Sequence, residues 1–397
     1  MASFPMDIVT DVLHRLPATT LVRCLLLSKP CFSLINSPDF IASHLKRTLE
    51  TEDHIMILLL TILRLLSLIE NPLLTGGFTQ FFGSVNGIIG LTNPPTDFAL
   101  FNPSTRKIHP LPVAPIDFPE RSLTRRQYVF YGLGHDSVTD DYKVVRMIQS
   151  KDRGGDDESV GYPFEVKVFS LKSNKWKRVQ LLSEDVEILF DSFFFRLLYR
   201  RGNGVLVSNS LHWILIHNEG DFGMNTIIRY DLATDELGLV SFSHDVYCKG
   251  MDIGVLGGCL CMMCYNEVRH ADVWIMREYG GEWSKFLSVP QPESVVSFEF
   301  VRPLVYSKDR RKILFEINNG KLFWFDLGSK SFETLVIKGC EDLQCNAEIV
   351  VSSLVLGCKG DLGRAREKKM MQKGNKRWGA HLYNVLSYLF LFLDSDI

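Results

Sequence analysis

The sequence predicts a mainly β protein, in which a small helical module is followed by a β-propeller-like domain of about six blades. Two observations lead to this prediction. Apolar residues recur at helical spacing near the N-terminus, but further along the pattern changes to short strands separated by turn residues. One hairpin pattern, an aromatic-bearing strand with a polar turn and a second strand, then occurs five times. We expect the helical module at residues 1–47, the propeller-like domain at 54–357 and a basic and apolar tail at 358–397.

Three short helices are predicted in the helical module. The apolar residues of the first helix recur on one face, at Ile8, Val9, Val12, Leu13 and Leu16. Pro5 suits the start of this helix, and Pro17 ends it. A second helix can run over residues 19–26, and a third can begin at Ser28 with Pro30 in its first turn. Helices of this length cannot bury a full core alone, so we expect a partner protein to cover part of their apolar surface.

The blades are predicted from the recurring hairpin and from the turns that precede it. The aromatic anchors of the five copies are Phe101, Phe169, Tyr230, Trp274 and Phe325, which lie 68, 61, 44 and 51 residues apart. Each hairpin follows another strand pair, with turns such as Asn86-Gly87 and Gly257-Gly258 that permit the positive φ angles of tight hairpins. Two hairpins make a four-stranded sheet. The anchor spacing brackets the propeller-blade period of about 40 to 50 residues, with loop insertions in the two longer gaps.

Two apolar strands remain outside the five predicted blades, at residues 54–59 and 349–356. Pairing the first strand with the last hides the sheet edges of a propeller, so we expect these strands to form a composite sixth blade. A twisted β-sandwich is the alternative architecture, because strand patterning alone does not separate the two.

Composition favours a reducing compartment, here the cytoplasm and nucleus, and gives no argument for a nucleic-acid partner. The formal net charge is −2, and nine cysteines are scattered without the regular spacing of a disulfide framework. No signal peptide is visible. The apolar runs at 55–69 and 382–393 are shorter than the roughly 18 to 20 residues of a membrane-spanning helix. Eight Lys or Arg residues against two acidic residues at 359–377 indicate a solvated tail, or a patch for nuclear import or an acidic partner.

The sequence predicts no catalytic residue, metal ligand or cofactor. Three cysteines between residues 259 and 264, with His270 nearby, are ligand types suited to zinc, but a second pair of ligands is missing. Small cysteines filling a buried strand explain this run better. The predicted loop at 135–141 holds one histidine and three aspartates, for which turn formation is the commoner role. The sequence also lacks a phosphate-binding loop, a hydrolase nucleophile elbow and a zinc-protease motif.

The chain resembles plant F-box proteins along nearly its whole length. The F-box likeness lies in Phe4-Pro5-Met6-Asp7-Ile8-Val9, Leu16-Pro17 and Leu21-Val22-Arg23-Cys24. The segments that resemble the F-box-associated domain of this family lie at residues 83–89, 101–107, 131–137, 140–146, 168–176 and 272–276. One position departs from the pattern: many family F-boxes have Trp where this chain has Cys31. That change removes a large apolar contact from the third helix and leaves Phe32 to replace it.

The resemblance implies a non-catalytic substrate receptor of a ubiquitin ligase. Family F-boxes dock on a Skp-type adaptor, which links them to a cullin and a RING subunit. The residues carried over from that pattern for adaptor binding are Pro5, Ile8, Val9, Leu13, Leu16, Pro17, Leu21 and Val22. Packing inside the module is the alternative role of each residue.

The resemblance also suggests a substrate class. At residues 27–31 and 352–360 the chain is most similar to family members that send intracellular nucleotide-binding leucine-rich-repeat (NLR) immune receptors for degradation and so restrain defence. Substrate contacts are expected in propeller loops, with the aromatic and basic run at 193–201 as one candidate. Two other classes of protein stay open: a propeller enzyme with a site in its central channel, and a scaffold that binds the adaptor without promoting ubiquitination.

Overall fold

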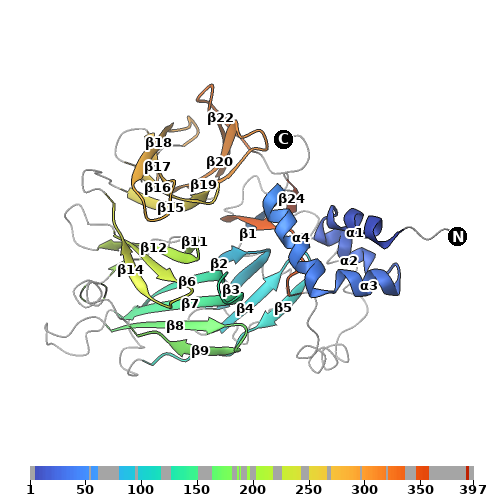
Figure 1. The fold of residues 1–397 in the computed structure, drawn as a ribbon. Helices are drawn as coiled ribbons and strands as arrows, with labels where there is room; N and C mark the ends of the chain where they lie inside the picture. The colour runs from blue at the N-terminus through green and yellow to red at the C-terminus, as the bar shows by residue number, and fades with distance from the viewer. Residues whose placement is uncertain are drawn as a thin grey trace, which may run out of the picture. The chain divides into compact units, whose positions relative to one another are not determined.

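The computed structural model of the chain is shown in Figure 1. It describes residues 5–52, 55–60, 80–93, 97–117, 127–150, 163–180, 186, 188, 195–196, 203–217, 226–242, 250–265, 270–295, 297–318, 321–335, 346–356 and 390–392. Two compact units make up the chain: unit 1 comprises Met1–Leu91, Phe98–Leu111 and Ala347–Ile397, and unit 2 comprises Thr92–Asp97 and Pro112–Asn346.

Unit 1 begins with four helices where the sequence predicted three. They are α1 (Met6–His14), α2 (Ala18–Cys24), α3 (Lys29–Ile35) and α4 (Pro38–Thr51). Ser28 caps α3 by accepting a hydrogen bond from the backbone N of Cys31, and Ser37 caps α4 in the same way, with prolines in the first turns. The fourth helix was missed, although Ser37 and Pro38 carry the same start signal as Ser28 and Pro30. None of the helices in the described part of the chain is long and apolar enough to cross a membrane.

The first blade follows these helices, and a smaller sheet joins the two ends of the β domain. The blade has the strand order β2 (Gln80–Val85), β3 (Ile88–Asn93), β4 (Asp97–Asn102) and β5 (Lys107–Pro110). The smaller sheet has the order β23 (Asn346–Val351), β1 (Ile55–Leu60) and β24 (Phe390–Phe392). The predicted pairing of the first strand with the strand near residue 350 is therefore confirmed, with a third strand beside it.

Four more antiparallel sheets follow, all in unit 2. The first holds β6 (Gln127–Asp136), β7 (Asp141–Ser150), β8 (Phe164–Ser170) and β9 (Lys175–Arg178). The next holds β10 (Phe195–Arg196), β11 (Val205–Val207), β12 (Ser210–His217), β13 (Thr226–Asp231) and β14 (Leu237–Val240). The last two hold β15 (Gly250–Leu256), β16 (Cys259–Tyr265), β17 (His270–Met276) and β18 (Trp283–Pro290), then β19 (Val301–Tyr306), β20 (Lys312–Ile317), β21 (Lys321–Asp326) and β22 (Phe332–Thr334).

The repeating pattern of the sequence thus corresponds to blades. All five aromatic anchors lie in equivalent strands, β4, β8, β13, β17 and β21, each of which pairs with the last strand of its sheet. Counting sheets of four or more strands among the described residues gives five blades rather than about six. The difference arises because the sheet that joins the two ends has three strands.

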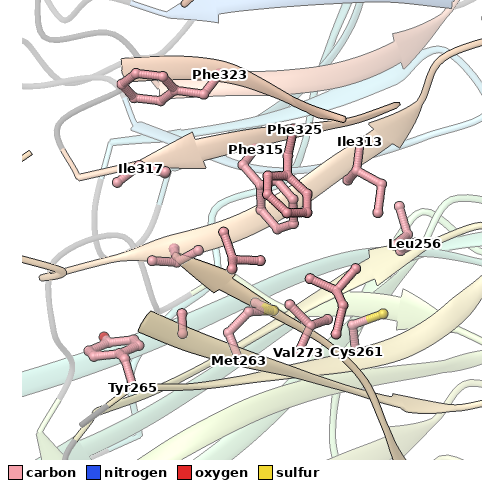
Figure 2. Packing of buried hydrophobic residues seen from close by; sticks show 14 of the residues in the cluster. Leu256, Cys261, Met263, Tyr265, Val273, Ile313, Phe315, Ile317, Phe323 and Phe325 are labelled. Carbon is pink, nitrogen blue, oxygen red and sulfur yellow. The ribbon is translucent and has the colours of Figure 1, made fainter. Parts of the chain in front are cut away.

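Apolar side chains between neighbouring blades form the core of unit 2. Figure 2 shows one such cluster, in which Met263 and Val273 of one blade lie against Phe315 and Phe325 of the next. Gly257 and Gly258, in the turn between β15 and β16, have φ angles of +57° and +79°, which match the tight hairpin turn predicted for them. The middle strands β16 and β20 are buried almost throughout, whereas burial alternates along the outer strand β18.

Candidate functional site

Several of the predicted docking residues lie inside the helical module rather than on its surface. Leu13 and Leu21 are buried in a core shared by the four helices. Val9, Leu16 and Val22 are partly buried and pack against this core. The structure therefore places these five residues where they stabilise the module, with Leu13 and Leu21 presenting almost no surface to a partner.

A second group of apolar residues is exposed, and we call it the exposed face. It consists of Met6, Ile8 and Val12 on α1, Leu26 and Leu27 after α2, and Phe32 on α3. Leu26 is 91% exposed and Leu27 is 71% exposed, which is unusual for residues beside core helices. Of the remaining predicted residues, Pro5 is exposed and Pro17 is partly buried. Six exposed apolar side chains on one small module are the candidate interaction surface of this chain.

Sequence reasoning found only part of the exposed face. Ile8 was predicted to bind the adaptor and Phe32 to replace a missing tryptophan, but Met6, Leu26 and Leu27 were missed. The signal for the two leucines was present, because three consecutive leucines at 25–27 cannot all point into one core.

Polar contacts hold α4 against α1. The Nε2 atom of His44 lies 2.8 Å from the carbonyl oxygen of Leu16, and the Nε2 atom of His14 lies 2.8 Å from Ser43 Oγ. The His14 ring also stacks on Phe40, with 4.4 Å between ring centroids. These contacts fix the helix that carries the N-terminal part of the exposed face.

Residues from the far end of the chain complete the helical module. We call residues 352–355, which follow β23, the return segment. Helix α2 begins after Pro17 without a side-chain cap of its own, and the backbone N of Ala18 instead donates to Ser352 Oγ at 3.0 Å. Leu354 is buried among the apolar core residues of the four helices. The module is thus capped and packed by residues more than 300 positions away in sequence.

The return segment is also bound to the first blade, through Asn102 at the end of β4. The Nδ2 atom of Asn102 donates to the carbonyl oxygens of Ser353 (3.0 Å) and Val355 (2.6 Å). Its Oδ1 atom accepts from the backbone N atoms of Ser104 and Thr105, at 2.8 and 3.1 Å. Asn102 is fully buried, so all these hydrogen bonds form away from water.

A second contact with the first blade lies at the turn between β2 and β3. Ser353 Oγ donates to the carbonyl oxygen of Asn86 at 2.6 Å. The next residue, Gly87, has a φ of +78°, and a Cβ atom there would collide with Ser353 Oγ and the carbonyl oxygen of Val351. Only glycine allows the return segment to approach the turn this closely.

The other clusters that the sequence singled out serve packing and turns. Cys261 is buried, and burial raises the pKa of its thiol to about 12, while Cys264 is disulfide-bonded. Burial would raise the pKa of Asp136, but hydrogen bonds from Thr139, Val138 and Asn209 outweigh it and lower the pKa to about 2. In the part of the chain that the structure describes, no group of three or more His, Cys, Asp or Glu residues is arranged to hold a metal ion.

A buried charge network fastens the loop before β6 to the second blade. Arg146 and Glu165 are both fully buried and form an ion pair of 2.6 Å between Nη2 and Oε1. The guanidinium of Arg146 also donates to the carbonyl oxygens of Ala114 and Pro115, and Lys167 forms an ion pair with Asp117. Burial lowers the pKa of Arg146, an effect that the facing Glu165 carboxylate opposes. Every charge here has a protein partner, as a structural network requires.

Comparison with known proteins identifies the family. The model of the F-box associated beta propeller domain matches residues 69–355. The chain belongs to the F-box proteins that carry this propeller domain. The match decides between the propeller and the β-sandwich in favour of the propeller. The 193–201 run, the candidate for substrate contact, lies outside the described residues except for the two residues of β10.

Relatives from Arabidopsis thaliana match along the whole length of this F-box protein. F-box protein At4g22390 is 55% identical, covering 96% of this chain and 98% of its own length. F-box protein CPR1 is 54% identical, covering 95% of this chain and 97% of its own. Among solved structures, an oligogalacturonate lyase in complex with manganese matches with a TM-score of 0.37 and 9% identity, covering 62% of this chain and 61% of that chain. A similarity of this size carries no functional argument.

Membership of the family indicates a role for each of the two parts of the chain. F-box proteins bind a Skp-type adaptor and a substrate and are typically non-catalytic substrate adaptors. The blades form the F-box associated propeller domain, and we propose that the helical module before them, with its exposed face, is the F-box.

Proposed function

We propose that this F-box protein is the substrate-recognition subunit of a Skp–cullin–F-box ubiquitin ligase. Through the adaptor it joins a cullin and a RING subunit, and it marks proteins for proteasomal degradation. The observation that supports this proposal best is the exposed face, six apolar side chains on a module whose own core is already filled. Covering these side chains with a partner removes apolar surface from water at no cost to the fold.

We further propose intracellular NLR immune receptors as the substrates, so that the protein restrains plant defence in the cytoplasm and nucleus. The likeness to F-box protein CPR1 over 95% of the chain supports this assignment. In this role the chain contributes proximity: it holds a substrate lysine near a ubiquitin-charged enzyme and so converts an encounter between two proteins into a local reaction.

The test is co-purification from plant cells of the Skp-type adaptor and cullin with the wild-type chain and with a Leu26→Asp, Leu27→Asp variant. The matched control is Val138→Asp, at an exposed valine of the propeller domain that is 75% exposed. We expect adaptor and cullin with wild type and control but not with the double variant, and a blotted immune receptor that accumulates only with the double variant.

Other outcomes separate the alternatives. Adaptor capture without any change in receptor level would indicate a scaffold that does not promote degradation, or a different substrate. Absence of adaptor from the wild-type complex would contradict the ligase proposal itself.

A further inference from the structure

The return segment is bonded to both the F-box and the first blade, so its position decides how these two parts of unit 1 are joined. On one side, Ser352 and Leu354 cap α2 and fill the F-box core. On the other side, Ser353 and Val355 accept hydrogen bonds from Asn102, and Ser353 donates to the turn between β2 and β3. Ser352 and Ser353 are fully buried.

We propose that Ser352, Leu354 and Asn102 are positioning residues, which hold the F-box in one orientation on the first blade and so fix how the ligase presents a substrate. This inference rests on the proposed ligase function. It assigns to these residues a role in the rate and geometry of ubiquitin transfer, separate from the binding of either partner.

The reason is the limited constraint that the chain itself supplies. Helix α4 ends at Thr51 and β1 begins at Ile55, so one short connection joins the F-box to the β domain on the N-terminal side. A single connection leaves rotation about its backbone angles, whereas several hydrogen bonds and a buried leucine remove that freedom. Transfer to a lysine depends steeply on distance and angle, so orientation that is fixed in advance lowers the entropic cost of each transfer.

Asn102 permits a substitution that removes the hydrogen-bond donor of the connection and keeps the acceptor. In Asn102→Asp, the carboxylate still accepts from Ser104 and Thr105, but it cannot donate to Ser353 and Val355 and instead repels their carbonyl oxygens. Asn318, a partly buried asparagine in the last blade, offers a control with the same pattern of hydrogen bonds. Its Oδ1 atom accepts from the backbone N atoms of Glu299 and Phe300, and its Nδ2 atom donates to the carbonyl oxygen of Ser297.

The first measurement is the distance distribution between spin labels on the F-box and on the first blade, by pulsed electron paramagnetic resonance. The labels are carried by unnatural amino acids at Ala42 on α4 and Lys107 on β5, which are both exposed. We expect a narrow distribution for the full-length wild type and for Asn318→Asp, and a broad one for Asn102→Asp. Ser352→Ala, which removes the acceptor for Ala18 and the 3.4 Å contact with Ser104 Oγ, provides a milder second variant should Asn102→Asp fail to fold.

The second measurement uses the ligase reconstituted with adaptor, cullin, RING subunit and a ubiquitin-charged enzyme. Transfer to the lysines of this chain itself is followed, so that no identified substrate is needed. We expect adaptor affinity within about twofold of wild type in every variant. Initial transfer should fall about fivefold in Ser352→Ala, the size expected for one lost buried hydrogen bond, and further in Asn102→Asp, which loses two. In both variants the modified lysines should be more widely distributed.

These results separate the inference from the function on which it rests. A wild-type chain that captures no adaptor contradicts the ligase function and this inference with it. With an active wild type, an unchanged distance distribution or unchanged transfer in the variants overturns the positioning role alone. Loss of transfer in proportion to loss of adaptor binding also overturns it, since the return segment then only supports folding of the F-box.

Discussion

The exposed face makes a quantitative prediction for Phe32. This residue is 54% exposed on α3. A phenylalanine side chain buries about 150 to 250 Å² when covered, so about 100 Å² remains for a partner to bury. At about 25 cal/mol per Å², that burial contributes about 2.5 kcal/mol to adaptor binding. Phe32→Ala should therefore raise the dissociation constant of the adaptor about 50- to 100-fold.

Substitutions in the exposed face should change adaptor affinity, whereas substitutions in the core of the module should change stability. Comparing the two kinds of variant gives the measurement its internal control. Phe32→Ala should change the free energy of unfolding by less than about 0.5 kcal/mol, because the side chain is more exposed than buried. Leu21→Ala removes a fully buried side chain, and its expected cost is about 3 kcal/mol of unfolding free energy. Titration calorimetry with purified adaptor gives the affinities, and urea unfolding gives the stabilities.

One pattern of results would refute the reasoning. If Phe32→Ala binds the adaptor within about twofold of wild type, while a still-folded Leu21→Ala variant binds far more weakly, then α3 does not contribute to the interface. The docking surface would then lie elsewhere on the module, and burial would be a poor guide to it. Val138→Ala, at an exposed valine between β6 and β7, should leave the affinity unchanged in either case.

Three further predictions concern the blades. Glu165→Ala leaves the buried Arg146 without its carboxylate and should cost about 3 to 5 kcal/mol in urea unfolding, whereas replacing both residues by methionine should recover most of that loss. Gly87→Ala should cost about 1 to 3 kcal/mol in the same assay, because residue 87 has a positive φ and lies against Ser353. Burial lowers the pKa of His212 to about 4, and the Nε2 atom of its ring lies 2.9 Å from the Tyr279 hydroxyl. The folded protein is therefore about 3 kcal/mol more stable above pH 6.5, where His212 is neutral, than below pH 4, where it is protonated. That contribution should disappear as the pH falls from about 6.5 to 4, and His212→Gln should lose this pH dependence; an equal loss in both proteins would show that other groups titrate.

The sequence was sufficient for the repeating part of the fold because each blade carries its own local signals. Aromatic anchors such as Phe101 and Phe325 recur in the same strand of each blade, and turns such as Gly257-Gly258 require conformations that few other residues adopt. The division of the F-box residues into core and surface was less accessible. Ile8 and Leu13 have similar hydropathy and lie on one helix, and only the placement of the other helices decides that Leu13 is buried while Ile8 is exposed.

The return segment shows which part of a site follows from topology and which does not. Helix α4 ends shortly before β1 begins, and β23 is the neighbour of β1 in its sheet, so the residues that follow β23 leave the same small sheet that the F-box leads into. That proximity was implied once the first and last strands were expected to pair. The contacts themselves were not implied, because a serine that caps a helix 334 positions away leaves no periodic trace in the sequence. Such a residue becomes recognisable only when an uncapped helix start, here at Ala18, is found next to it.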